Sequence, residues 1–203
     1  MLPIKVRYLN MALGQAQRIA DFFTKKAMDN SNKGENMTPL KVQKLLYYAY
    51  AWKYSLQKER IFTDKIEAWD YGPVVSDIYH ELKKYGYHPI NELKTDPELL
   101  PDELRGYLNT IWHSYGEYSA TMLSDMTHDE EPWKNAYASD SKIITDESLA
   151  EFYSEENADS LLPQNTVITI KDGKKTLMKL NKETVKAISS ENFVDFDINS
   201  LKE

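Results

Sequence analysis

The segment from Met126 to Trp133 holds the side chains best suited to chemistry. His128 is followed directly by three carboxylates, Asp129, Glu130 and Glu131. An imidazole beside carboxylates can act as an acid, a base or a set of metal ligands. The spacing argues against such a site, because no second histidine stands four residues away, as it does on a metalloprotease helix. The other histidines form no motif with it: His80, His88 and His113.

Acidic residues before Pro132 and Trp133 also fit the start of a helix, where the helix dipole favours negative charge. We favour this structural interpretation of the segment. A metal-dependent hydrolase centred on His128 is the alternative, and metal analysis of the wild type and of His128→Ala would separate the two.

No other pattern indicates an enzyme. The chain of 203 residues has no cysteine, which excludes thiolate nucleophiles, disulfides and cysteine-based zinc sites. Its 7 glycines form no phosphate-binding loop, and no Gly-x-Ser-x-Gly elbow is present. We therefore expect no catalytic residue, no metal site and no cofactor.

Charge and hydropathy bound the partners and the location. The formal net charge is −7 and the isoelectric point about 5.2, so general nucleic-acid binding is not expected, and no basic recognition helix stands out. An acidic chain fits a basic protein partner better. No apolar run approaches the roughly 18 residues of a membrane span, and the N-terminus lacks a signal-peptide core. We expect a cytoplasmic protein without membrane contact.

Helical periodicity dominates the first three quarters of the chain. It predicts helices over 12–28, 38–56, 75–85 and 102–115, a short helix from Ser119 to about Met126, a turn or helix at 133–137, and a helix capped by Thr145 or Asp146 and ending near Tyr153. Loops are expected at 29–36 and 87–101, where Asn, Gly and Pro gather. The sequence thus predicts a mainly α fold built as a helical bundle.

The helix over 38–56 is the centre of that prediction. Thr38 is a good N-cap and Pro39 suits the first helical position. One stripe of the helix is apolar and an adjacent stripe carries Tyr47, Tyr50 and Tyr54, which indicates packing on two sides. The tyrosines fit core packing better than an interface, and we expect Lys41 and Lys44 on the solvated side.

The segment Trp69-Asp-Tyr-Gly-Pro73 is predicted to form a rigid turn. It follows a short strand or extended segment at 65–69, and Gly72 with Pro73 restricts the backbone there. The turn would lock two helices together. It could also present Trp69 and Tyr71 in a groove.

After about residue 156 the sequence changes from helical periodicity to β-prone runs. Two β-prone runs, 166–171 and 174–180, flank Asp172-Gly173, which is typical of a β-hairpin. Asn181 could cap a short helix to Ile188, and an acidic tail follows. We therefore divide the chain into a helical domain, 1–156, and a C-terminal appendage, 157–203, whose hairpin must dock on the helical body or on a partner.

Three ordered motifs resemble the Panacea domain of SocA-like and phage-associated GepA-like antitoxins. They are Thr-Pro-Leu-Lys-Val-Gln-Lys-Leu-Leu-Tyr-Tyr-Ala (38–49), Glu-Ala-Trp-Asp-Tyr-Gly-Pro-Val-Val (67–75), and Leu-Ser-x-x-Thr-His-x-x-x-Pro-Trp (123–133). Each motif alone is weak, but the set in this order is specific and spans roughly 12–155. The resemblance makes the following residues structural members of the family motifs: Thr38, Pro39, Leu45, Leu46, Gly72, Pro73, Thr127, His128, Pro132 and Trp133.

The resemblance implies a helical antitoxin of a type II toxin–antitoxin system, often encoded in phages or prophages. It implies neutralisation of a co-encoded protein toxin by direct contact. One relative instead delivers its toxin to a Clp-type protease, so a proteolytic adaptor is an alternative, as is a phage regulator of a host protein. Self-association into a homo-oligomer is left open.

Six residues are predicted to contact the partner, together with the C-terminal segment. They combine the second stripe of the central helix with the aromatic turn: Lys44, Tyr47, Tyr50, Tyr54, Trp69 and Tyr71.

Overall fold

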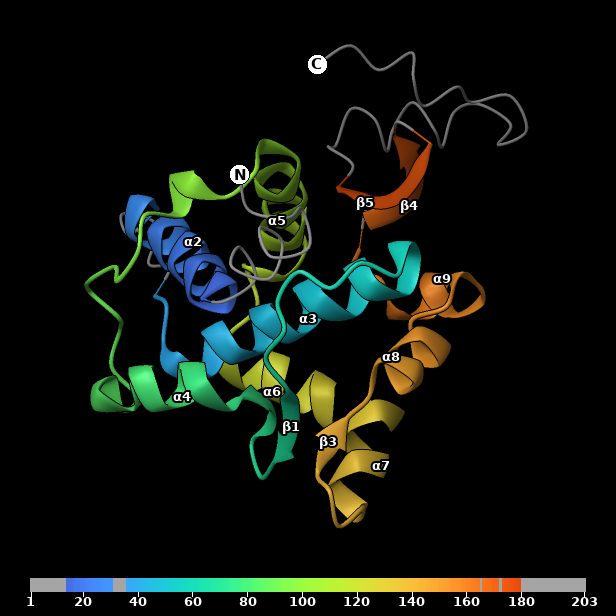
Figure 1. The fold of residues 1–203 in the computed structure, drawn as a ribbon, viewed down its shortest axis with the longest axis horizontal. Coiled ribbons are helices and arrows are strands. Elements are labelled where there is room, and N and C mark those ends of the chain that lie inside the picture. Colours follow the sequence, from blue (N-terminus) through green and yellow to red (C-terminus); the bar gives the residue numbers. More distant parts are fainter. Residues whose placement is uncertain (1–13, 31–35, 165, 172, 180–203) are drawn as a thin grey trace, which may run out of the picture.

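The computed structural model describes residues 14–30, 36–164, 166–171 and 173–179. The helix expected at 181–188 and the acidic tail lie outside these residues. Helices form most of the described structure, with two small antiparallel sheets, so the predicted mainly α class is confirmed (Figure 1).

Helix α3, Pro39–Gln57, is the central element (Figure 1). The Thr38 side chain caps it, with Oγ1 accepting a hydrogen bond from the Lys41 amide at 3.3 Å, and Pro39 occupies its first turn as predicted. Every residue from Lys41 to Lys53 is buried. A helix that is buried on every face must be surrounded by other elements of the fold.

The neighbours of α3 come from the whole described chain. α2 (Gln15–Asp29), α5 (Asp102–Tyr115), α6 (Ala120–His128) and α8 (Asp146–Phe152) pack directly against it. α4 (Ser76–Leu82) also contacts α3, and α7 (Glu131–Ala138) packs on α6 and α8. Ser119 and Thr145 cap α6 and α8 through side-chain oxygens, as their positions predicted.

A three-stranded antiparallel sheet contains the Trp69–Pro73 segment. Strands β1 (Ile66–Trp69) and β2 (Gly72–Val75) form a tight hairpin, and β3 (Ile143–Ile144) pairs with β1 on its other side. The predicted turn is therefore displaced: Asp70 and Tyr71 make the turn, whereas Gly72 and Pro73 belong to the second strand. The segment forms the tip of a hairpin and is not a link between two helices.

The C-terminal β-hairpin is present as predicted. β4 (Thr166–Lys171) pairs with β5 (Lys174–Lys179), with Lys171 opposite Lys174. β5 packs on α5 and α3, and the Gln57 side chain donates to the Lys175 carbonyl at 2.6 Å. Short helices precede it: η4 (Glu155–Asn157) and α9 (Ala158–Leu161). The domain boundary near 156 stays a prediction.

Two further short helices lie between α4 and α5. η2 (Lys83–Tyr85) ends at Gly86, the predicted stop, and η3 (Pro97–Leu99) interrupts the expected loop. No helix in the described part of the chain is long and apolar enough to cross a membrane.

Candidate functional site

The β1–β2 hairpin is held from beneath by two side chains of α3. The Gln43 amide bonds both backbone groups of Val75, accepting from its N–H at 2.8 Å and donating to its carbonyl at 3.3 Å. From the next residue of α3, the Lys44 Nζ donates to the Pro73 carbonyl at 3.2 Å. These contacts satisfy backbone groups of β2 that no neighbouring strand pairs on that side.

The tip of the hairpin is held from the other side by α6 and α7. The Ser124 hydroxyl donates to the Tyr71 carbonyl at 2.9 Å, and His128 Nε2 lies 3.0 Å from the Asp70 carbonyl. The Trp133 indole N–H donates to the Trp69 carbonyl at 3.1 Å. Three successive carbonyls of the turn thus receive three side chains of the distal family motif, which fixes the backbone of the tip.

Gly72 lets the two supports approach each other. It has a φ of 96°, and a Cβ placed there would lie 2.4 Å from Lys44 Nζ and 2.6 Å from Thr127 Oγ1. Both the backbone conformation and the lack of space require glycine. The two motifs that contain Lys44 and Gly72 therefore meet at one point of the interior.

Lys44 is fully buried, so its expected position on a solvated face is wrong; Lys41 is buried as well. The polar residues on this side of α3 indicated a solvated face, but the helix has neighbours on every side. Loss of water on burial lowers the pKa of Lys44 to about 7, although the carboxylate of Glu130 acts in the opposite direction. The amine is thus poised between its charged and neutral forms.

Glu130 is the second titratable group in this interior. Its carboxylate accepts hydrogen bonds from three tyrosine hydroxyls: Tyr47 at 2.6 Å, Tyr48 at 3.0 Å and Tyr153 at 2.7 Å. Burial raises its pKa to about 7, and these three hydrogen bonds oppose that rise. Sequence reasoning grouped Glu130 with the acids of a helix start, whereas its side chain points into the core from the N-cap of α7.

The roles of Gln43, Ser124 and Glu130 were not predicted. Gln43 and Ser124 lie inside the quoted family motifs, but their residue types did not distinguish them from surface positions. A signal existed for Glu130: adjacent buried tyrosines at 47 and 48 need a partner for each hydroxyl.

Aromatic side chains gather around the hairpin tip. Trp69 lies edge-on to Tyr79, with ring centres 4.8 Å apart, and Trp133 stacks on Tyr137 at 4.7 Å. Tyr71 projects from the turn and is 74% exposed, while Tyr79 and Tyr137 are each 36% exposed. We call Trp69, Tyr71, Tyr79, Trp133 and Tyr137 the tip surface.

The remaining predicted contact residues lie along α3. Tyr47 is fully buried and Tyr50 is 6% exposed, in accord with the core-packing interpretation. Tyr54 is half-buried and stacks near Tyr50, with ring centres 6.1 Å apart. Of the six residues predicted to contact a partner, Tyr71, Trp69 and Tyr54 are at least partly exposed. Their contact with a partner stays a prediction.

Several of the structural motif residues lie in the interior. Leu45, Leu46 and Thr127 are fully buried, and Pro132 is buried in the first turn of α7. The Thr127 hydroxyl donates to the Ser124 carbonyl at 2.8 Å, which places it against Gly72.

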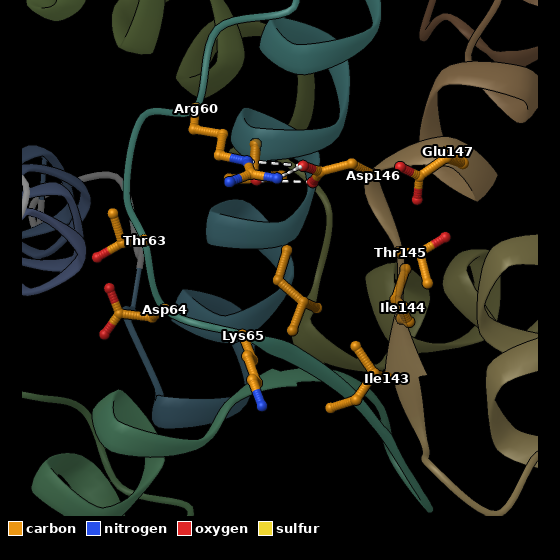
Figure 2. A pocket seen from close by; sticks show the side chains of 11 residues that line it. Arg60, Thr63, Asp64, Lys65, Ile143, Ile144, Thr145, Asp146 and Glu147 are labelled. Atoms are coloured by element: carbon orange, nitrogen blue, oxygen red, sulfur yellow. Dashed lines mark hydrogen bonds and ion pairs between the residues drawn. The ribbon is translucent and has the colours of Figure 1, made fainter.

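A pocket of about 350 Å³ opens where β1 and β3 diverge (Figure 2). Its upper wall is an ion pair in which Arg60 Nε donates to Asp146 at 2.7 Å, and Tyr50 donates to the same carboxylate at 2.8 Å. Ile66, Ile143 and Ile144 line the pocket together with Thr63, Asp64, Lys65, Thr145 and Glu147, and the Asp64 side chain points away from the ion pair (Figure 2). The polar groups of the upper wall already satisfy one another.

His128 contacts the hairpin tip and an aromatic side chain of α7. Its ring contacts the Asp70 carbonyl and lies edge-on to Trp133, with ring centres 4.3 Å apart. Glu130 points into the core, away from the position of a joint site with His128, and the residues that the structure describes contain no group of three or more potential metal ligands.

Comparison with known proteins identifies the region that contains this site. Residues 42–134, somewhat less than half of the chain, match the family model described as "Antitoxin SocA-like, Panacea domain". No curated protein and no solved structure matches the chain. The matched range includes most of α3, the β1–β2 hairpin and the start of α7, and it contains all the contacts to the hairpin backbone described above. The resemblance read from the three motifs is confirmed: residues 42–134 are similar to the SocA-like Panacea domain.

Proposed function

We propose that this chain is the antitoxin of a type II toxin–antitoxin system and neutralises a co-encoded protein toxin by direct binding. The observation that carries the proposal is the position of Tyr71. This side chain is 74% exposed, yet it stands on a turn whose backbone is hydrogen-bonded to α6 and α7.

Rigid presentation of an exposed aromatic side chain favours binding. Tyrosine and tryptophan supply large contact areas and dominate the energetics of protein interfaces. A turn that is already ordered loses little conformational entropy when a partner binds. The tip surface therefore has the composition and the rigidity of an interface, and all of it except Tyr137 lies within the matched residues 42–134.

A non-catalytic role in the cytoplasm completes the proposal. The polar groups that could perform chemistry are engaged within the protein: His128 binds the Asp70 carbonyl, and Glu130 accepts from three tyrosines. A general base or a metal ligand needs a free lone pair that reaches a substrate. The buried Glu130 has no such access.

Co-expression with the product of the adjacent reading frame tests the function. Growth arrest by the neighbour, relieved by this chain with co-purification of a stable complex, is the expected outcome. Relief of arrest with disappearance of the neighbour would instead indicate a proteolytic adaptor. Absence of both toxicity and complex formation would contradict the proposal.

A further inference from the structure

The segments that hold the hairpin tip carry a set of exposed carboxylates. Asp70 belongs to the turn itself, Asp125 follows the Ser124 that binds the turn, and Asp129 follows His128 in the same way. Glu131 opens α7, two residues before Trp133. The tip surface thus lies among segments that carry exposed carboxylates, at the end of the molecule formed by the hairpin and α7 (Figure 1), and the Asp70 carboxylate accepts a hydrogen bond from the Tyr137 hydroxyl at 2.8 Å.

Within the described part of the chain, Asp125, Asp129 and Glu131 form no ion pair. Lys134 and Lys142 interact with other groups. Lys134 Nζ donates to the Asp129 backbone carbonyl at 2.6 Å, and Lys142 Nζ lies over the Tyr137 ring at 4.3 Å.

We infer that the tip surface docks on the cationic, nucleic-acid-binding face of its protein partner and so excludes nucleic acid from that face. The inference rests on the proposed function and names the partner surface that the antitoxin covers. Aromatic rings and carboxylates together offer what a nucleic-acid-binding groove recognises: flat faces for stacking and fixed negative charges.

Arginine chemistry explains the match. A guanidinium pairs with carboxylates through paired hydrogen bonds and stacks on aromatic faces, and a basic groove presents several of them. Charge complementarity of this kind raises the association rate and selects the partner. The net charge of −7 on the whole chain also attracts a cationic partner over a longer range.

Two triple variants that replace carboxylates by amides of the same shape distinguish the effect of charge near the tip surface from the effect of the net charge of the chain. The first is Asp125→Asn, Asp129→Asn and Glu131→Gln, beside the tip surface. The control is Glu117→Gln, Glu151→Gln and Glu156→Gln; these carboxylates are exposed, form no ion pair within the described residues and lie outside the segments that hold the tip. Both variants change the net charge by three.

The experiment uses the product of the adjacent reading frame as partner and a fluorescein-labelled single-stranded RNA as competitor. We expect the wild type to displace the RNA from that protein. We expect the first triple variant to raise the Kd for the protein by about 10- to 100-fold and to weaken its salt dependence, and the control to change the Kd by less than about 3-fold.

The outcomes are distinguishable. Equal effects of the two triple variants, or simultaneous binding of RNA and the chain to the partner, would overturn this inference and leave direct neutralisation intact. Failure of the wild type to bind the partner at all would overturn the proposed function together with it.

Discussion

The Nζ atom of Lys44, in the middle of α3, lies 3.2 Å from the carbonyl oxygen of Pro73 in β2. This hydrogen bond joins the first and second family motifs inside the core. The third motif reaches the same hairpin through Ser124 and His128. The three motifs are therefore parts of one support, and the element that they support is the turn that bears Tyr71.

Gly72→Ala should disrupt this support. The φ of 96° is unfavourable for alanine, and its Cβ would collide with Lys44 and Thr127. We expect the free energy of unfolding to fall by about 1–3 kcal/mol in urea denaturation. Gly106→Ala is the matched control, because Gly106 lies in α5 with open space around it and should gain up to about 1 kcal/mol. Equal effects at both positions would contradict the close packing at Gly72.

Ser124→Ala should loosen the tip without unfolding the body. The variant removes the hydrogen bond to the Tyr71 carbonyl, which should cost about 1 kcal/mol of stability. Hydrogen exchange followed by mass spectrometry should show faster exchange in a peptide covering 69–73. Ser160→Ala removes a hydrogen bond within α9 and should leave exchange in that peptide unchanged. Unchanged exchange in both variants would mean that Ser124 does not hold the turn.

The stability of the domain should pass through a minimum near pH 7. Burial raises the pKa of Glu130 from 4.5 to about 7, so its contribution is complete below pH 4.5 and is lost as the pH rises through 7. Burial lowers the pKa of Lys44 from 10.5 to about 7, so its contribution is complete above pH 10.5 and is lost as the pH falls through 7. With about 1.4 kcal/mol per pKa unit, the two limbs should span on the order of 3–5 kcal/mol.

Urea unfolding between pH 4.5 and 10 measures both limbs. Glu130→Gln should flatten the change below pH 7, and Lys44→Met should flatten the change above it. A wild-type stability that is constant over this range, or identical profiles for the three proteins, would contradict the assignment of the two groups.

Local signals in the sequence predicted the helices well. The caps at Thr38, Ser119 and Thr145 mark helix starts in the structure, and the helix over 102–115 has the expected bounds. The Asp-Gly hairpin is also correct. Each of these depends on interactions between residues close in the chain, which a sequence displays directly.

Features that depend on distant contacts were missed. β3 has two residues, and it exists because Ile143 and Ile144 pair with β1 from 76 positions away or more. Lys44 was expected in solvent because its burial requires a carbonyl from β2 and a carboxylate from α7. Glu130 was expected at an ordinary helix start because its three tyrosine partners come from α3 and from the end of α8.

Isothermal titration calorimetry of the purified chain with the product of the adjacent reading frame tests the central claim most directly, comparing the wild type with Tyr71→Ala and Tyr87→Ala. Tyr71 and Tyr87 are 74% and 84% exposed, so neither substitution should change the unfolding midpoint. We predict that Tyr71→Ala raises the Kd at least about 10-fold and that Tyr87→Ala leaves it within about 2-fold of the wild type. A Tyr71→Ala protein that is folded and binds the partner as tightly as the wild type would contradict the account.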